Sequence, residues 1–256
     1  MSEILVAGGT GLLGRRVVDG LRAADHSVRV LSRSGRPGTV RGDLLTGEGL
    51  ERAVDGLDAI VHCASSPLRK TRQTDVDGTE RLLRATARAG VSHVVYISIV
   101  GVDRAPYYPY YRAKLETERV VEGSPVPWTI LRATQFHEFA LRILQLLERL
   151  PVMLVPKGFL LQPVDVGEVA DRLVKLALSD PAGRVPDMGG PEVRTMAELS
   201  DTYFGIAGRQ RRILEVPLPG KTARAFREGA QVCLDECAYG KIRWEDFLRE
   251  TLVPAV

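Results

Sequence analysis

The sequence predicts an α/β fold in which helices cover a parallel sheet. Two observations lead to this prediction. Short apolar runs rich in β-branched residues alternate with segments of helical periodicity along the first half of the chain. A glycine-rich loop directly follows the first of these runs. The 256 residues, 45% hydrophobic and 26% charged, are enough for one large globular domain with a small additional lobe.

Strands and helices are expected to alternate through the first half of the chain. The apolar runs predict strands over residues 4–7, 28–31, 59–63, 94–98 and 128–131. Apolar residues at helical spacing predict helices over residues 12–24, 49–54, 75–89 and 112–121. Gly90 is expected to end the helix over 75–89. This order is that of βαβ units, which produce a parallel sheet.

The alternation ends after residue 131. A long apolar helix is expected over 135–150, and Pro151, Pro156 and Pro163 then break the chain into loops. Further helices are expected over residues 169–178, 196–204, 221–230 and 244–252. We therefore expect a sheet-bearing domain over residues 1–150. Residues 151–256 should form a smaller substrate-binding lobe that is partly interleaved with it.

The composition argues against several classes of function. The 35 basic and 32 acidic residues contain no basic block, so no nucleic-acid partner is expected. No apolar run reaches the ~18–20 residues that cross a bilayer, and the first residues lack the basic start of a signal peptide. Cys63, Cys233 and Cys237 are too few for a disulfide framework, and no histidine cluster predicts a metal site. The sequence predicts a cytoplasmic protein with no membrane partner.

The loop after the first strand predicts a dinucleotide site. Its glycines follow the spacing Gly8-x-x-Gly11-x-x-Gly14. Gly8 permits a tight turn, Gly11 lets the backbone approach a pyrophosphate, and Gly14 lets the helix pack close to the strand. The N-terminus of that helix offers free N–H groups to phosphate. The expected contacts of the pyrophosphate are Gly8, Thr10, Gly11, Leu12 and Gly14.

The end of the second strand indicates which dinucleotide is bound. An acidic residue that would bind a ribose 2′-hydroxyl is expected there, but the sequence reads Ser32-Arg33-Ser34. The guanidinium of Arg33 can pair with a 2′-phosphate, and Ser32 or Ser34 can add a hydroxyl. The pattern therefore favours NADP(H). Asp43 and Leu44 can contact the adenine edge, although a turn cap would equally explain the aspartate.

Further motifs resemble one family in the order in which they occur. They are Gly42-Asp-Leu44, Asp75-Val-Asp-Gly-Thr-Glu80, Val94-Val-Tyr-Ile-Ser98, Tyr111-Arg-Ala-Lys-Leu-Glu116, Pro127-Trp-Thr-Ile-Leu-Arg132 and Gln162-Pro-Val-Asp-Val166. With the glycine loop and Arg33, they are similar to the atypical short-chain dehydrogenases/reductases of the NmrA-like, NAD(P)H-binding group. The resemblance covers about residues 3–180. It implies a Rossmann-type, doubly wound fold and a nicotinamide cofactor.

The resemblance also implies a catalytic set. Tyr110 and Lys114 form Tyr-x-x-x-Lys, a spacing that puts both on one face of a helix. In the family, the lysine lowers the pKa of the tyrosine and holds the nicotinamide ribose, and the tyrosine protonates the substrate carbonyl. Ser98 is the candidate third member, although this set is often incomplete in the atypical branch. Lys114 is the main candidate, and a neighbouring tyrosine could replace Tyr110.

Two further loops are expected at the carboxyl edge of the sheet. Ala64 and Ser65 follow the strand over 59–63 and should run under the cofactor. The loop after the strand over 128–131 supplies the candidate substrate contacts Thr134, Gln135, Phe136 and His137. His137 could donate a proton, but a packed histidine is an equal alternative.

The favoured function is NADPH-dependent reduction of a small apolar or aromatic carbonyl, quinone or enone compound. The alternative is a non-catalytic, NADP(H)-sensing regulatory protein of the NmrA-like type. A sugar epimerase or dehydratase is less favoured, because those enzymes use tightly held NAD and a longer C-terminal lobe. The expected partners are a small-molecule substrate and a second copy of the chain in a homodimer.

Overall fold

The computed structural model describes residues 1–233 and 237–252, and they form two compact units. The first unit combines residues 1–98, 109–132 and 167–185. The second unit combines residues 99–108, 133–166 and those from 186 onward. The chain thus passes between the units several times. Residues 133–150, assigned to the first domain by the sequence analysis, cluster with the second unit.

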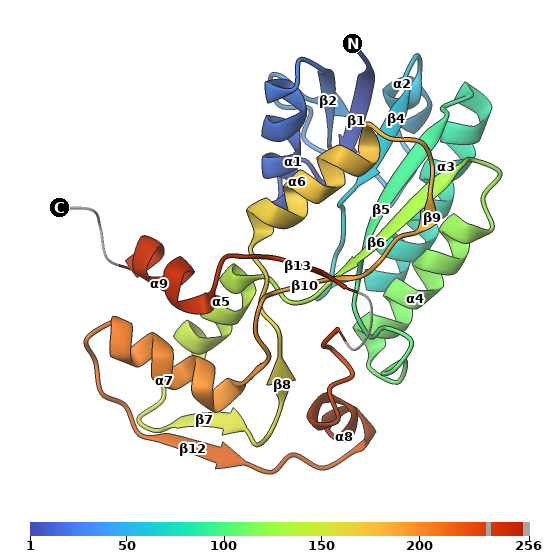
Figure 1. Ribbon diagram of the computed structural model, residues 1–256. Coiled ribbons are helices and arrows are strands. Elements are labelled where there is room, and N and C mark those ends of the chain that lie inside the picture. Colours follow the sequence, from blue (N-terminus) through green and yellow to red (C-terminus); the bar gives the residue numbers. More distant parts are fainter. Residues whose placement is uncertain (234–236, 253–256) are drawn as a thin grey trace. The chain divides into compact units, whose positions relative to one another are not determined.

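A parallel sheet forms the centre of the first unit, as predicted (Figure 1). Its strands are β1 (Glu3–Ala7), β2 (Ser27–Ser32), β3 (Val40–Arg41), β4 (Ala59–His62), β5 (His93–Ile99), β6 (Trp128–Ala133) and β9 (Gly183–Arg184). The strand order is β6-β5-β4-β1-β2-β3, and β9 pairs in parallel with β6. Successive strands are added on one side of β1 up to β3 and then on its other side from β4 onward. The sheet is therefore doubly wound.

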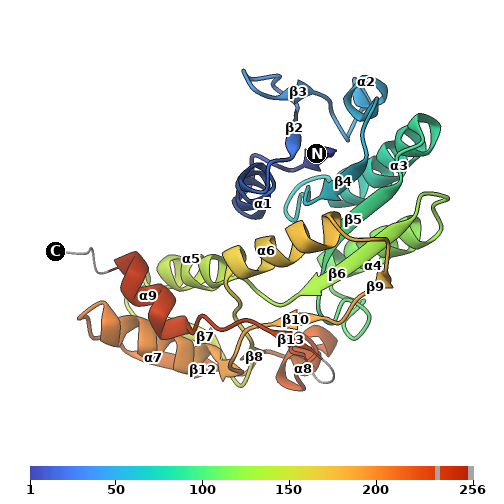
Figure 2. The same ribbon diagram turned by 45° about the horizontal axis from the view of Figure 1, so that its top comes forward.

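Helices cover both faces of this sheet (Figure 2). α1 (Leu12–Ala23) and α6 (Val166–Ala177) lie on one face. α2 (Leu50–Val54), α3 (Asp77–Ala89) and α4 (Pro109–Glu122) lie on the other. A π-helical turn, η1 (Arg72–Val76), precedes α3. The core between the sheet and the second set of helices includes Leu5, Leu31, Leu50, Leu82, Val94, Tyr96 and Val121.

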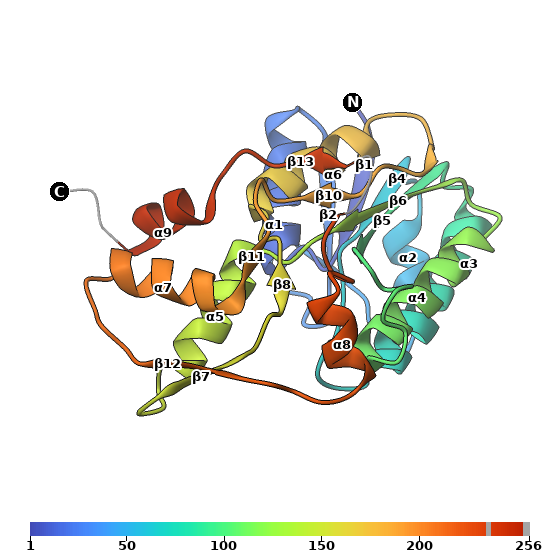
Figure 3. The ribbon, with the colours of Figure 1, turned by 60° about the horizontal axis from the view of Figure 1, so that its bottom comes forward.

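The second unit is built from helices and short strands (Figure 3). Its helices are α5 (His137–Leu147), α7 (Met196–Ile206), α8 (Lys221–Arg227) and α9 (Trp244–Leu252). Its strands are β7 (Met153–Pro156), β8 (Leu160–Leu161), β10 (Met188–Gly189), β11 (Arg194–Thr195), β12 (Ile213–Val216) and β13 (Ala238–Tyr239). β7 pairs with β12, β8 with β11, and β10 with both β13 and the last residue of β6. The four helices confirm the sequence prediction, whereas the short strands were not predicted.

Thr195 shows how the sequence starts a helix in this unit. Its hydroxyl accepts a hydrogen bond from the backbone N–H of Glu198, and the Glu198 carboxylate accepts one from the backbone N–H of Thr195. This reciprocal capping box fixes the start of α7. Leu199 and Tyr203 of α7 then pack with Trp244 and Leu248 of α9 in the core of the unit.

No helix within residues 1–233 and 237–252 is long and apolar enough to cross a membrane. Over the same residues, no group of three or more histidine, cysteine, aspartate and glutamate side chains is arranged to hold a metal ion.

Replacement of Gly14 by alanine is expected to destabilise the fold. A Cβ atom at Gly14 would lie 2.2 Å from the carbonyl oxygen of Gly8, and backbone atoms cannot yield as a flexible side chain does. We expect Gly14→Ala to lower the free energy of unfolding by about 1–3 kcal/mol, measured by urea denaturation. Gly205→Ala in α7 is the control, since its Cβ meets no atom within 4 Å and should raise stability by about 0.5–1 kcal/mol. A Gly14→Ala protein as stable as the wild type would contradict this account.

Candidate active site

The strand order locates the candidate site in the first unit. The order changes direction between β1 and β4, and dinucleotides bind outside the carboxyl ends of the strands at such a point. The loops that follow these two strands touch through their backbones. A Cβ atom at Gly8 would lie 2.6 Å from the backbone nitrogen of Ala64. Only glycine therefore allows this close approach of the two loops.

The glycine loop leaves the start of α1 open to an anion. The N–H of Gly11 donates to the Gly8 carbonyl at 2.9 Å, which closes the turn. Gly11 is the N-cap of α1, no side chain caps it, and the first turn carries no acidic residue. Thr10, Gly11 and Leu12 are exposed. The amide groups and the dipole of this 12-residue helix thus face the position expected for a pyrophosphate.

Arg33 lies immediately after β2 with its side chain exposed. It forms no ion pair or hydrogen bond with any residue that the structure describes, so its guanidinium is available to a ligand. The Ser32 and Ser34 hydroxyls lie beside it, 3.1 Å apart. The role of Ser32 and Arg33 toward a 2′-phosphate stays a prediction.

Asp43 has a structural role of its own. One of its carboxylate oxygens accepts a hydrogen bond from the N–H of Leu45 at 2.8 Å, which is the turn cap considered as the alternative. The side chain of Leu44 is buried in the core beside α3. Their contacts with adenine remain a prediction.

Lys114 is buried in the first unit, with 3% of its surface exposed. Its ammonium donates to the carbonyl oxygen of Ile97 at 2.8 Å and lies 4.3 Å from the centre of the Tyr96 ring. Burial lowers the pKa of Lys114 from 10.5 to about 8, and the negative charges of Asp75 and Glu118 act in the opposite direction. The lysine is therefore held in one place at the carboxyl end of β5.

Tyr110 is the second residue of α4 and lies one turn before Lys114. Its hydroxyl lies 3.0 Å from the Ser65 hydroxyl, so the structure joins a predicted catalytic residue to a predicted cofactor-loop residue. Ser65 in turn donates to the carboxylate of Asp75 at 2.5 Å. Asp75 was not predicted as a site residue, because its partner Ser65 lies ten residues away along the chain. Its burial at 2% exposure was the missing information.

Ser98 is also buried, at the end of β5. Its hydroxyl oxygen has no hydrogen-bond partner among residues 1–233 and 237–252. Ala64, by contrast, is partly buried and packs against the core of the first unit. The catalytic role of Ser98 and the cofactor contact of Ala64 remain predictions.

The four candidate substrate contacts lie in the second unit, and each already has partners there. The Thr134 hydroxyl donates to the Gln162 carbonyl at 2.5 Å, and the Gln135 amide donates to the Gln231 carbonyl at 3.1 Å. Phe136 forms a β-bridge with Val164. These contacts describe local structure, and substrate binding by the loop remains a prediction.

His137 is fully buried. Its ring lies 5.0 Å from the Phe247 ring and 5.7 Å from the Trp244 ring, measured between centroids. Burial lowers the pKa of His137 to about 4, so the ring is neutral near pH 7. This environment favours the packed histidine over the proton donor.

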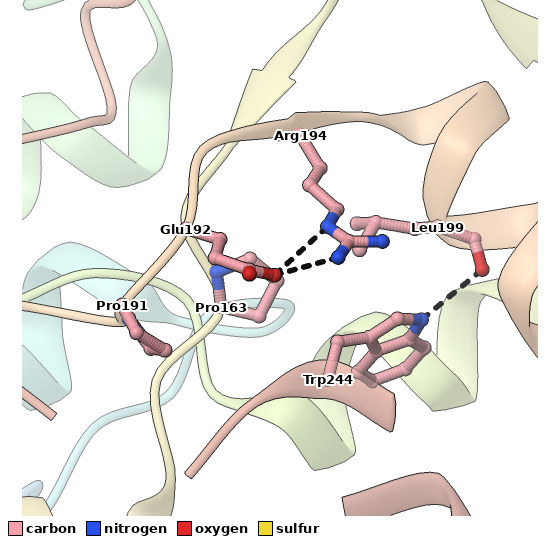
Figure 4. Close-up of a pocket in the computed structure, with 6 residues that line it drawn as sticks. All are labelled: Pro163, Pro191, Glu192, Arg194, Leu199 and Trp244. Carbon is pink, nitrogen blue, oxygen red and sulfur yellow. Dashed lines mark hydrogen bonds and ion pairs between the residues drawn. The ribbon is translucent and has the colours of Figure 1, made fainter. Parts of the chain in front are cut away.

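A small cavity in the second unit lies close to these aromatic rings (Figure 4). Its volume is about 10 Å³, room for one water molecule. An ion pair of 2.6 Å between Arg194 and Glu192 closes one side, and the Trp244 indole donates to the Leu199 carbonyl. The cavity is too small for an organic substrate.

Comparison with known proteins identifies the family. A family model described as NAD(P)H-binding matches residues 8–142. The chain belongs to the NAD(P)H-binding family. The predicted membership among atypical, NmrA-like short-chain dehydrogenases/reductases, with a nicotinamide cofactor, is thereby confirmed.

Two curated relatives show the range of this family. The chain is 30% identical to a (4-alkanoyl-5-oxo-2,5-dihydrofuran-3-yl)methyl phosphate reductase of Streptomyces griseus, over 89% of this chain and 86% of that protein. It is 26% identical to the photosystem II assembly factor Ycf39 of Trieres chinensis, over 84% of this chain and 72% of that protein. The family therefore includes reductases as well as assembly factors.

The fold agrees with that of a solved structure. A short-chain dehydrogenase/reductase superfamily protein from Agrobacterium tumefaciens, with bound NAD, superimposes with a TM-score of 0.77. The match covers 98% of this chain and 96% of that one at 19% identity. The Rossmann-type fold is confirmed.

The residues of this NAD(P)H-binding chain fit the cofactor. The open N-terminus of α1 suits its pyrophosphate, and Arg33, which has no partner among residues 1–233 and 237–252, suits a 2′-phosphate. The backbone contacts at Gly8 and Gly14 leave no room for a side chain in the loop. Lys114 lies at the carboxyl end of β5, the edge at which the ribose is expected.

Burial of Lys114 should make stability depend on pH. The folded protein releases this proton near pH 8 and the unfolded chain near pH 10.5, so the unfolded chain binds more protons between these values. Stability contributed by the group therefore rises with pH across this window. Relative to Lys114→Met, which lacks the titration, the free energy of unfolding of the wild type should rise by roughly 3 kcal/mol from pH 7 to pH 10.5. Urea denaturation of both proteins measures it, and a constant difference would show an unperturbed lysine.

Proposed function

We propose that this protein is an NADPH-dependent reductase of a small apolar or aromatic carbonyl, quinone or enone compound. The observation that carries the proposal is that α4 holds a buried lysine four residues after a tyrosine, and that the hydroxyl of this tyrosine contacts Ser65. Ile97 and Tyr96 fix Lys114, and Ser65 contacts Tyr110 at 3.0 Å. A spacing of four residues directs both side chains to the same face of α4.

Each part of the cofactor has a set of residues to hold it. The glycine loop and the start of α1 bind the pyrophosphate. Arg33 and Ser32 bind the 2′-phosphate, and Ala64 and Ser65 line the cofactor after β4. Lys114 binds the nicotinamide ribose, in keeping with the family resemblance.

The chemistry is a hydride transfer coupled to a proton transfer. When bound, NADPH supplies the hydride that the carbonyl carbon accepts, and it is oxidised to NADP⁺. Tyr110 donates its phenolic proton to the carbonyl oxygen, so the C=O double bond becomes an alcohol. The Lys114 ammonium stabilises the phenolate that remains. With its pKa near 8, Lys114 is mostly protonated at pH 7.

The relatives support two functions. The Streptomyces griseus reductase is named for a substrate that carries an oxo and an alkanoyl group, which supports reduction of a carbonyl or enone compound. The Ycf39 relative is named as an assembly factor, which supports the alternative of an NADP(H)-sensing regulatory protein. The two functions differ in proton transfer, because a reductase needs a proton donor whereas a sensor needs only a bound cofactor.

Arg33 should determine the preference for NADPH. Arg33→Ala removes the charged partner of the 2′-phosphate, so NADPH affinity should fall roughly 10- to 100-fold while NADH affinity stays unchanged. Fluorescence titration with each cofactor measures both constants. Arg52→Ala in α2 is the matched control, since Arg52 is also exposed. Equal loss of NADPH and NADH affinity in Arg33→Ala, or a wild type that prefers NADH, would overturn the assignment.

Lys114 should be required for turnover. The wild type is assayed with NADPH against a panel of quinones, enones and ketones, and Lys114→Met is then assayed with the best substrate. We expect kcat to fall at least about 100-fold, because the phenolate loses its stabilising charge. Unchanged turnover in Lys114→Met would contradict the role of the lysine. Tight NADPH binding by the wild type without turnover of any panel member would favour the sensor.

A further inference from the structure

Asp75 is a buried carboxylate next to the candidate active site, and both of its oxygens are engaged. One oxygen accepts from the Ser65 hydroxyl at 2.5 Å, and the other accepts from the backbone N–H of Ser66 at 2.8 Å. Only 2% of the residue is exposed. A buried carboxylate loses its hydration. The two hydrogen bonds that its oxygens accept replace part of that hydration.

The chemistry of these groups fixes the direction of the next hydrogen bond. An ionised carboxylate only accepts, so the single hydroxyl proton of Ser65 is given to Asp75. In the contact of 3.0 Å between Ser65 and Tyr110, the tyrosine is then the donor. The resulting chain of hydrogen bonds runs from the Tyr110 hydroxyl to Ser65 and from Ser65 to Asp75.

The carboxylate end of this chain is held from two sides. The Thr71 hydroxyl donates to the Ser66 carbonyl at 2.7 Å, which braces the loop that follows β4. The Thr79 hydroxyl donates to the backbone carbonyl of Asp75, and His62 of β4 contacts Thr79 at 2.8 Å. Asp75 itself lies in η1, and π-helical turns are frequent at functional sites.

We propose that Asp75 is a positioning residue that acts through Ser65 to hold the Tyr110 hydroxyl and to keep it in the donor role. The proposal rests on the proposed reductase function, in which Tyr110 must carry a proton when the substrate arrives. Ser65 then has a second role besides lining the cofactor, because it transmits the effect of the Asp75 carboxylate to the hydrogen bonding of the Tyr110 phenol. Loss of the carboxylate would let Ser65 turn and donate to Tyr110, which favours the phenolate.

The decisive measurement is the titration of Tyr110 in the cofactor-free protein. Tyrosine labelled with ¹³C at Cζ reports ionisation by NMR, and Tyr110→Phe assigns the signal. Among the described residues, the titratable groups that act on this phenol include Asp75 from η1, through Ser65, and Tyr96 from β5, over which Lys114 of α4 lies; the Arg72–Glu116 pair also joins η1 to α4. All except Asp75 are the same in wild type and Asp75→Asn. We expect Asp75→Asn to lower the midpoint of Tyr110 by about one pH unit.

The same substitution in a Ser65→Ala background separates the chain of hydrogen bonds from a simple charge effect. A charge acting through space would lower the midpoint equally with or without the Ser65 hydroxyl. An effect transmitted by Ser65 should shrink to less than half when the hydroxyl is absent. Equal shifts in the two backgrounds, or no shift in either, would overturn the proposal.

Turnover gives a second readout. Asp75→Asn should lower kcat about 10- to 100-fold and leave the Kd for NADPH within about twofold, because the proposed charged and backbone contacts of the cofactor, at Arg33 and the glycine loop, do not involve Asp75. Asp77→Asn is the matched control, since Asp77 lies two residues further on and pairs with Arg72 at the surface. If Asp75→Asn does not fold, Ser65→Ala tests the link alone, and an unchanged Tyr110 midpoint together with an unchanged kcat would refute it.

The two proposals can fail separately. A wild type that turns over, with activity lost in Lys114→Met but unchanged in Asp75→Asn, would leave the reductase standing and remove the positioning role. A wild type that binds NADPH tightly but turns over no panel member would favour the sensor over the reductase, and the NMR titration would still decide whether Asp75 controls the protonation of Tyr110.

Discussion

Much of the first unit depends on how it compensates the buried ammonium of Lys114. A cation with 3% exposure needs acceptors and opposite charge close by, since water does not solvate it. The end of β5 supplies a carbonyl and the ring of Tyr96, and Asp75 and Glu118 supply negative charge. The start of α4 is thereby tied to the carboxyl edge of the sheet, the position from which Lys114 and Tyr110 can serve a cofactor.

The next turn of α4 is fixed by a second buried charge. Glu118 is fully buried and accepts two hydrogen bonds from Arg132 of β6, at 2.8 and 2.7 Å, and one from Arg184 of β9 at 2.9 Å. A bidentate pair of this kind sets the orientation of both groups as well as their distance. One turn of α4 therefore carries a cation compensated by β5 and the next turn an anion compensated by β6 and β9. These contacts fix which turn of α4 faces β5 and which turn faces β6 and β9.

The sequence predicted those features that depend on local spacing. The glycine loop, the alternation of strands and helices and the Tyr110–Lys114 pair all occur within short segments, so periodicity reveals them. The two-residue strands of the second unit are too short to show any period. Asp75 and Glu118 were missed for another reason, because their partners Ser65 and Arg132 lie 10 and 14 residues away along the chain. The path of the chain between the units likewise follows from distant contacts, so composition shifts gave no sign of it.

The buried charges bear on whether this family member is an enzyme or a sensor. Both functions need the glycine loop and Arg33, since these only bind a dinucleotide. A sensor also needs Lys114 if that residue holds the nicotinamide ribose, but it has no use for a carboxylate that holds a phenol through Ser65. A buried carboxylate reduces stability relative to an apolar residue of similar size, and a task in proton transfer explains why Asp75 is kept beside the phenol. The contact chain from Asp75 through Ser65 to Tyr110 therefore supports the proposed reductase rather than the proposed sensor.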